Sequence, residues 1–238
     1  MKKATLVFGI ALLLISCNSD KKKSSDSSDA QTSEKTSKKT DGKTYDCLIE
    51  FDDKYDELIT REELASIYPF DVDEAKEKIS NRSYGEYMVS WPSDRPDITM
   101  EVAGRTMNLP DRNTMGVAVL NFESEKSDLE SIRDKFDMGY KDLSEEEIQK
   151  IEKNLENASE EVRASGEKLM AARKKNKSEF IDGIGSSAWY KWNENHGGEL
   201  AVLAGRAKFN VRLKISDDPF ENKEYAMKIA SLILAKCD

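Results

Sequence analysis

Three cysteines and one histidine are the side chains of this 238-residue chain whose types suit covalent, redox or metal chemistry. His196 lies in residues 193–198, a segment rich in asparagine and glycine that is typical of a turn. A Ser/His/acid triad or a histidine-based metal site has to include this imidazole, and no serine stands in a Gly-x-Ser-x-Gly pattern. We therefore expect an exposed turn residue and predict no enzyme activity, catalytic residue, cofactor or metal. The alternative is a metal-dependent hydrolase in which His196 meets nearby carboxylates.

Cys17 ends a basic and apolar leader. Lys2 and Lys3 precede an apolar run at positions 4–15, which is too short to cross ~30 Å of hydrocarbon as a finished helix. The residues Leu14-Ile15-Ser16-Cys17 resemble the lipobox of bacterial lipoproteins. This resemblance implies a signal peptide at 1–16 that is cleaved before Cys17. It also implies that the Cys17 sulfur carries a diacylglycerol and that the new amino terminus carries a fatty acid such as palmitate.

The lipobox resemblance further implies a lipid-anchored protein of the cell envelope. By the sorting rule of enterobacterial lipoproteins, Asn18 after the cysteine favours the outer membrane, with the domain facing the periplasm. Residues 18–44 hold no large aliphatic or aromatic side chain, so we expect 17–44 to be a lipidated cysteine followed by a disordered tether. Such a tether reaches about 30 Å on average.

The net charge limits the class of partner. It is −9 for the full chain and −11 once Lys2 and Lys3 leave with the leader. Because residues 18–44 hold seven lysines against five acidic residues, the chain from Tyr45 onward carries −13. A nucleic-acid partner requires a Lys/Arg surface that displaces counterions from phosphates, so we predict none. The membrane, through Cys17, and an unknown protein or small molecule remain as partners.

The other two cysteines stand at opposite ends of the predicted domain. Cys47 lies at its start, and Cys237 is the penultimate residue of the chain. In an oxidising compartment they are natural candidates for a disulfide that closes residues 45–238 on themselves. The alternative is two buried or terminal thiols that never meet.

Hydrophobic periodicity predicts an α+β fold, with an antiparallel sheet packed by helices. Thr60 and Glu63 have capping-box spacing and announce a helix that Pro69 ends, and a helical turn is expected between Asp73 and Ile79. Strands are expected at 84–91, 98–102, 115–122, 188–192, 200–204 and 209–215. Pro219 at a first helical position announces the last helix.

The halves at about 45–122 and 179–238 are expected to be a duplicated helix-plus-strands unit. Trp91 precedes Gly104 by the same thirteen positions that separate Trp192 from Gly205, and an arginine follows each glycine. The helical insert at about 124–177 opens with a short helix that Gly139 could end. It continues with apolar or small residues at a heptad spacing from Ile148 to Ala172. This pattern predicts a long helix or helical hairpin that packs within the chain, and a coiled-coil assembly protein is the alternative.

The body also resembles a group of uncharacterised envelope lipoproteins. Residues Gly183-Ile184-Gly185 followed by Ala188-Trp189-Tyr190 are similar to their Gly-Leu-Gly-Asp-x-Ala-aromatic pattern, although Ser186 replaces the aspartate. The resemblance implies a cystatin-like or PsbP-like sandwich. We therefore expect a membrane-anchored, non-enzymatic binding or assembly module of unknown specific role. Because aromatic side chains anchor interfaces, Trp91, Trp189, Tyr190 and Trp192 are the candidate contact surface, with core packing as the alternative.

Overall fold

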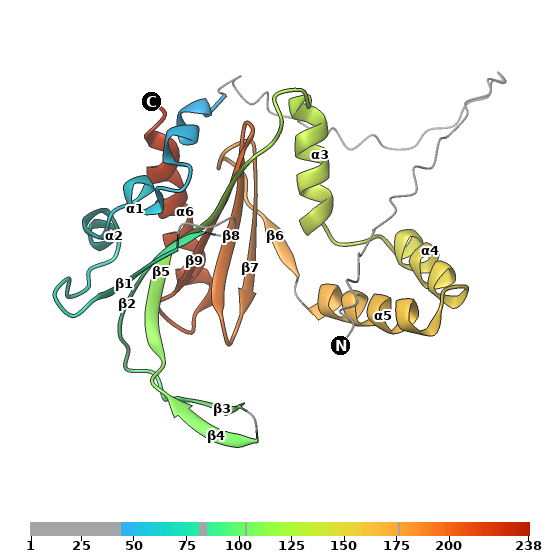
Figure 1. Ribbon diagram of the computed structural model, residues 1–238, viewed down its shortest axis with the longest axis horizontal. Helices are drawn as coiled ribbons and strands as arrows, with labels where there is room; N and C mark the ends of the chain where they lie inside the picture. Colours follow the sequence, from blue (N-terminus) through green and yellow to red (C-terminus); the bar gives the residue numbers. More distant parts are fainter. Residues whose placement is uncertain (1–43, 81–84, 103, 176) are drawn as a thin grey trace, which may run out of the picture. The chain divides into compact units, whose positions relative to one another are not determined.

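A computed structural model of the chain describes residues 44–80, 85–102, 104–175 and 177–238. The leader, Cys17 and the tether as far as residue 43 lie outside the described residues. The described part has an α+β fold, in which helices pack on an antiparallel sheet, as the sequence predicts (Figure 1). None of its helices is both long enough and apolar enough to cross a bilayer.

The main sheet has seven antiparallel strands in the order β1-β2-β5-β9-β8-β7-β6, and β3 and β4 pair only with each other. The strands are β1 (Lys76–Ser80), β2 (Glu86–Pro92), β3 (Ile98–Val102), β4 (Arg105–Leu109), β5 (Arg112–Phe122), β6 (Ser178–Phe180), β7 (Ser187–Asn193), β8 (Gly197–Ala204) and β9 (Ala207–Lys214). The long strands β5 and β9 pair at the centre and join the two halves of the chain.

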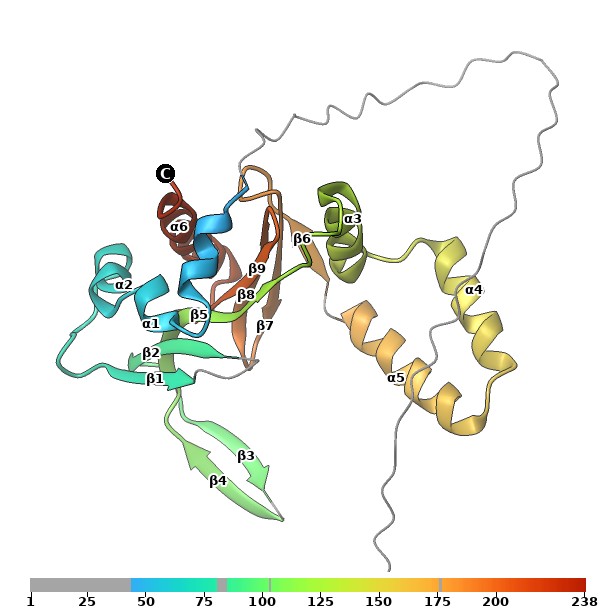
Figure 2. The same cartoon turned by 45° about the horizontal axis from the view of Figure 1, so that its top comes forward.

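The helices are the 3-10 helix η1 (Asp46–Phe51) and the α-helices α1 (Tyr55–Leu58), α2 (Arg61–Ile67), α3 (Leu129–Tyr140), α4 (Glu145–Glu156), α5 (Glu160–Lys175) and α6 (Pro219–Ala235). Figure 2 shows α6 and α3 on opposite sides of the main sheet. We call these two sides the α6 face and the α3 face. Helix α2 packs against α6, and α1 packs on β2 and β5 in the same core, so the α6 face is the more heavily covered.

Local sequence signals start the helices where expected. The Thr60 hydroxyl accepts from the Glu63 amide and the Glu63 carboxylate accepts from the Thr60 amide, so the predicted capping box of α2 is confirmed. Asp218 accepts from the amide of Phe220 at the start of α6, where Pro219 supplies a first-turn residue that needs no amide partner.

The main core lies on the α6 face. Alternate residues of the central strands point into it, for example Val117 of β5 and Val211 of β9, both fully buried. Helix α6 adds Ile229 and Ile233, which are also fully buried. The alternating buried side chains of the strands and the apolar stripe of α6 therefore pack together in one core layer.

One predicted helical segment differs in the structure. The segment expected to be a helical turn between Asp73 and Ile79 instead forms a turn followed by β1, because pairing with β2 satisfies its backbone groups. The heptad pattern forms the helical hairpin that was one of the two predicted arrangements, with α4 and α5 joined at residues 157–159. Gly166 allows the approach, because a Cβ atom there would overlap the side chain of Leu155. Gly139 lies inside α3, which continues to Tyr140.

The first part of the chain supplies three strands of the main sheet followed by a helix, β1-β2-β5-α3, and the last part supplies four followed by a helix, β6-β7-β8-β9-α6. The tryptophan and glycine echo does not coincide with this repeat. Gly104 and Gly205 both have positive φ in hairpin turns, but the first hairpin is the separate β3–β4 ribbon and the second lies inside the main sheet. The ribbon is an addition to the first half.

Candidate functional site

The four aromatic residues predicted as a contact surface do not share one surface. Trp91 is only 7% exposed and stacks on Phe70, with ring centroids 4.4 Å apart, and Tyr190 is only 4% exposed. Trp192 packs against the same core on the α6 face. Trp189 points to the α3 face, where its indole nitrogen donates to Asp137 at 2.8 Å. The contact-surface prediction is therefore wrong, because strand alternation places these rings in core packing on both faces.

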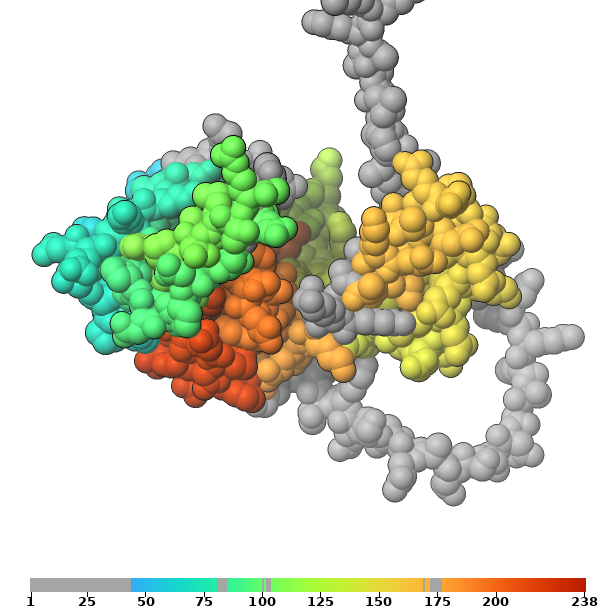
Figure 3. Space-filling view, turned by 90° about the horizontal axis from the view of Figure 1, so that it is seen from below, coloured from blue at the N-terminus to red at the C-terminus, as the bar shows by residue number. Residues whose placement is uncertain are grey.

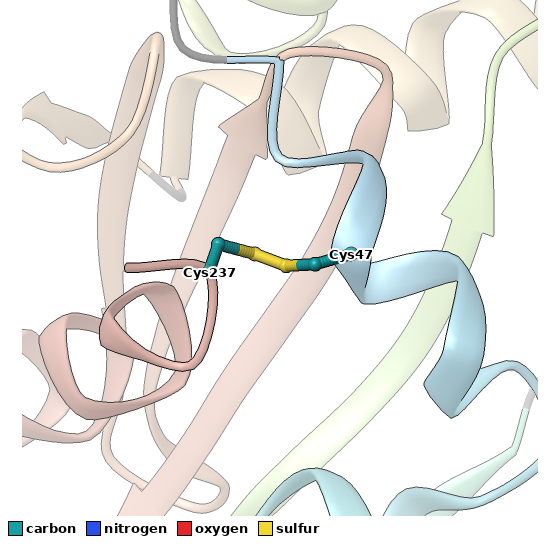
Figure 4. Close-up of a disulfide and its surroundings, with 2 residues drawn as sticks. All are labelled: Cys47 and Cys237. Carbon is teal, nitrogen blue, oxygen red and sulfur yellow. A yellow bond between two sulfur atoms is a disulfide. The ribbon is translucent and has the colours of Figure 1, made fainter.

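Cys47 and Cys237 are joined as a disulfide, with their Cα atoms 5.6 Å apart (Figure 4). The bond links η1 to the residues that follow α6, across a sequence separation of 190 residues. Both cysteines pack against the main core. The domain is thereby closed at its two ends.

His196 lies in the exposed β7–β8 turn, where its backbone amide bonds to Asn193. It borders a hollow of about 470 Å³ on the α3 face, together with Glu199 and Arg212. Glu199 accepts from both Arg212 and Lys191 at 2.7 Å. In the described ranges, no three His, Cys, Asp or Glu side chains come together in a group that could hold a metal ion.

The α3 face collects basic residues in spite of the acidity of the chain. Seven strand positions on this face carry Lys or Arg and two carry Glu: Lys76, Lys78, Arg112, Lys191, Lys208, Arg212 and Lys214, against Glu86 and Glu199. We call these nine residues the charged row. It crosses β1, β2, β5, β9, β8 and β7.

Alternating charges connect the charged row from strand to strand. Lys78 lies 2.5 Å from Glu86, and Arg212 lies 3.9 Å from Glu86 and 2.7 Å from Glu199. Arg212 reaches Glu86 across β5 at the position of Gly116, which has no side chain to block the contact. The lack of a Cβ atom at Gly116 is also required by packing, because a Cβ would overlap the carbonyl oxygen of Tyr87.

Nearby cations keep two glutamates of this face, Glu199 and Glu123, ionised. Burial alone would raise the pKa of Glu199, but hydrogen bonds and charges from Lys191 and Arg212 outweigh it and hold this pKa below its usual value. A hydrogen bond from Lys208 likewise lowers the pKa of Glu123, which follows β5 on the same face. At neutral pH these carboxylates therefore form ion pairs with the neighbouring cations and do not act as proton donors.

Helix α3 borders the charged row and shapes the surface beside it. Ile132 and Phe136 pack on Ala201 and Leu203 of β8, and Asp137 accepts from Ser187 of β7. A second hollow of about 280 Å³ lies between α3 and the centre of the sheet, lined by residues such as Tyr140, Lys208 and Asn210. Val119, at the β-bulge of β5, borders it with φ of 58°. The face thus offers two open hollows beside the charged row.

Sequence reasoning missed the charged row. The alternation of Lys208, Asn210, Arg212 and Lys214 with buried residues of β9 indicates a solvated face, but only the strand order places β1 and β7 on either side of it. The net charge of the chain did not indicate the charged row either, because a sum over all residues does not show where the cations lie. The row is therefore a property of the fold.

Comparison with known proteins gives no relative. No family model, curated protein or solved structure matches this chain. The similarity to bacterial lipoproteins and to uncharacterised envelope lipoproteins stays a prediction from the quoted residues. Any function is accordingly argued from the leader sequence and from the geometry of the described domain.

Proposed function

We propose that this protein is a lipid-anchored, non-enzymatic binding module of the bacterial cell envelope. The support for the anchor is the Leu14-Ile15-Ser16-Cys17 sequence after a short basic and apolar leader. The pairing of Cys47 with Cys237 fits an oxidising compartment outside the cytoplasm. The polar segment 18–44 then serves as the tether between the lipid and the domain.

The α3 face is the binding surface of this module, and its ligand is an extended acidic peptide. The single observation that carries this assignment is the excess of Lys and Arg in the charged row of an otherwise acidic chain, in which Lys214 is buried and the other six cations are at least partly exposed. With strands about 4.8 Å apart, the row from β1 to β7 spans about 24 Å, which is longer than a small molecule. A chain of carboxylates in extended form matches both the length and the charge of the row.

The test uses a dye-labelled hexaglutamate peptide, which is about 20 Å long when extended. Binding to the full chain is followed by fluorescence anisotropy at increasing salt. We expect saturable binding that weakens with salt, because exposed charges are screened. A hexalysine peptide tests whether acidic patches elsewhere bind a charged peptide equally well.

Matched variants locate the binding site. Lys76→Glu with Lys78→Glu reverses two exposed cations of the charged row and should weaken hexaglutamate binding about tenfold or more. Lys54→Glu with Lys228→Glu makes the same change in charge at exposed positions of the helical side and should leave most of the affinity. Equal loss in both double variants, or no binding by the unaltered chain, contradicts the assignment.

A further inference from the structure

The β3–β4 ribbon has one apolar face and one polar face. Its cross-strand pairs alternate, so that Ile98, its partner Leu109 and Met107 lie on one side. Ile98, Met107 and Leu109 are 36%, 45% and 41% exposed. On the other side, Thr99 bonds to Asn108 at 2.9 Å, and Glu101 pairs with Thr106. Figure 3 shows this ribbon, in green, at the molecular surface.

An uncovered apolar ribbon is unusual in a soluble domain. A two-stranded sheet is only marginally stable by itself in water and normally buries one face against another element. Within the described residues, β3 and β4 make their main contacts with each other and pair with no strand of the main sheet. Contiguous exposed apolar side chains of this kind mark an interaction surface.

A buried ion cluster fixes the ribbon to the main sheet. Arg95, just before β3, donates to Asp111 at 2.8 Å and to Asn113 at 2.7 Å, and Lys214 of β9 donates to Asp111 at 2.8 Å. The side chains of Arg95, Asp111 and Lys214 are only 8–11% exposed. The base of the ribbon is therefore held firmly, and its apolar face is presented in a defined position.

Near the tip of the ribbon, the cation Arg105 lies on the apolar side and the acid Glu101 on the polar side, and two further acids lie at the base. Arg105 is exposed beside the hairpin turn, whereas Asp94 and Asp97 are exposed at the base. If two ribbons lie face to face and antiparallel, the tip of each meets the base of the other, and both apolar faces are covered. A parallel arrangement would instead place the two Arg105 side chains together. Charge thus selects the antiparallel two-fold arrangement.

We propose that the β3–β4 ribbon is a self-association surface, covered by the same ribbon of a second copy in this antiparallel arrangement. Each strand is about 17 Å long, so the interface is smaller than the ~1,200 Å² that stable complexes bury. The dimer is accordingly weak and forms at high local concentration. This inference does not rest on the proposed anchor or on the acidic ligand.

Other occupants fit the ribbon less well. Residues 18–44 have no large apolar side chain to place on it, and a −13 charge from Tyr45 onward opposes contact with anionic lipid. A separate protein would have to supply both an apolar strip and the reversed end charges. A second copy has both by symmetry.

The test is sedimentation velocity of the full chain in density-matched detergent over a wide range of protein concentration. The unaltered chain should pass from monomer to dimer as concentration rises. Met107→Glu places a charge on the apolar face and should weaken the dimer about tenfold or more. Asn108→Glu adds the same charge to the same strand on the polar face, and the dimer should persist. Circular dichroism melting checks that both variants keep the fold.

A charge exchange tests the antiparallel arrangement. Arg105→Glu should weaken the dimer, and adding Asp97→Lys to it should restore association, because the end charges are then reversed together. A chain that stays monomeric at every concentration overturns the proposal. Equal weakening of the dimer by Met107→Glu and Asn108→Glu also overturns it, and so does a double variant that does not recover association. The proposal likewise fails if Met107→Glu abolishes binding to phosphatidylglycerol vesicles and leaves dimerisation unchanged.

Discussion

At the scale of single residues, the most demanding interaction is the buried cluster around Asp111. Two cations, Arg95 and Lys214, donate to this one carboxylate, and Arg95 also donates to the carbonyl oxygen of Arg112 at 2.9 Å. Burial alone would raise the pKa of Asp111, but the two cations outweigh it and hold the pKa below its usual value. Removing the carboxylate would leave both cations without their shared partner.

Asp111→Asn should therefore lower the free energy of unfolding by about 3–5 kcal/mol at pH 7, the usual cost of breaking a buried ion pair. Because the folded pKa lies below the unfolded one, the contribution of Asp111 is complete above about pH 4 and is lost as pH falls through the folded pKa. Urea unfolding followed by circular dichroism at several pH values measures this. A difference between variant and parent that does not shrink in acid would contradict it.

Single-residue features were predictable where their partners are close in the chain. The Thr60 and Glu63 box and the Asp218 cap are read from spacings of two or three residues. The Asp111 cluster joins residues 16 and 103 positions apart, which no local pattern shows. The aromatic residues were assigned wrongly for a related reason, since aromatic type alone does not distinguish an interface from the inside of a strand.

At the scale of elements, β5 is the strand on which both faces depend. It pairs with β2 and β9, carries Val117 into the core and presents Gly116 to the charged row. A Cβ atom at position 116 would overlap the backbone of Tyr87 and Met88 on β2. The glycine therefore serves close strand packing as well as the contact between Arg212 and Glu86.

Gly116→Ala should reduce the free energy of unfolding by about 1–3 kcal/mol, because the strands must move apart to admit a methyl group. Gly139→Ala is the matched control. Nothing lies within 4 Å of a Cβ atom there, and alanine in the last turn of α3 should be neutral or stabilise by up to about 1 kcal/mol. Urea denaturation of both variants measures the pair, and equal effects of the same sign would refute the packing argument.

Elements were predictable where one face is buried. Strands β2 and β9 follow the expected alternation, and α3 and α6 have clear apolar stripes. Strand β1 was not predicted, because Lys76–Ser80 holds a single large apolar residue, Ile79. Only its pairing with β2 identifies it as a strand. The heptad pattern of 148–172 allowed a hairpin but did not locate its reversal, which lies at residues 157–159.

At the scale of the whole molecule, the disulfide closes the domain, and the two ends of the central strand β9 contact different parts of the chain. Cys47 and Cys237 close a loop of about 190 residues, which on the chain-entropy account stabilises the fold by roughly 5 kcal/mol. Thr44 lies against Gly205 in the β8–β9 turn, so the tether enters at one end of β9. Lys214 and the base of the β3–β4 ribbon lie at the other end. Thr44 and the base of the ribbon thus lie at opposite ends of β9.

Intact-mass and peptide mass spectrometry of the protein from the envelopes of its native host tests the central claim most directly. We predict a chain that begins at Cys17, carries the mass of a diacylglycerol and a fatty acid on that residue, and has Cys47 bonded to Cys237. A chain that still begins at Met1, has no acyl group on Cys17 and carries two free thiols would contradict the account of a lipid-anchored module outside the cytoplasm.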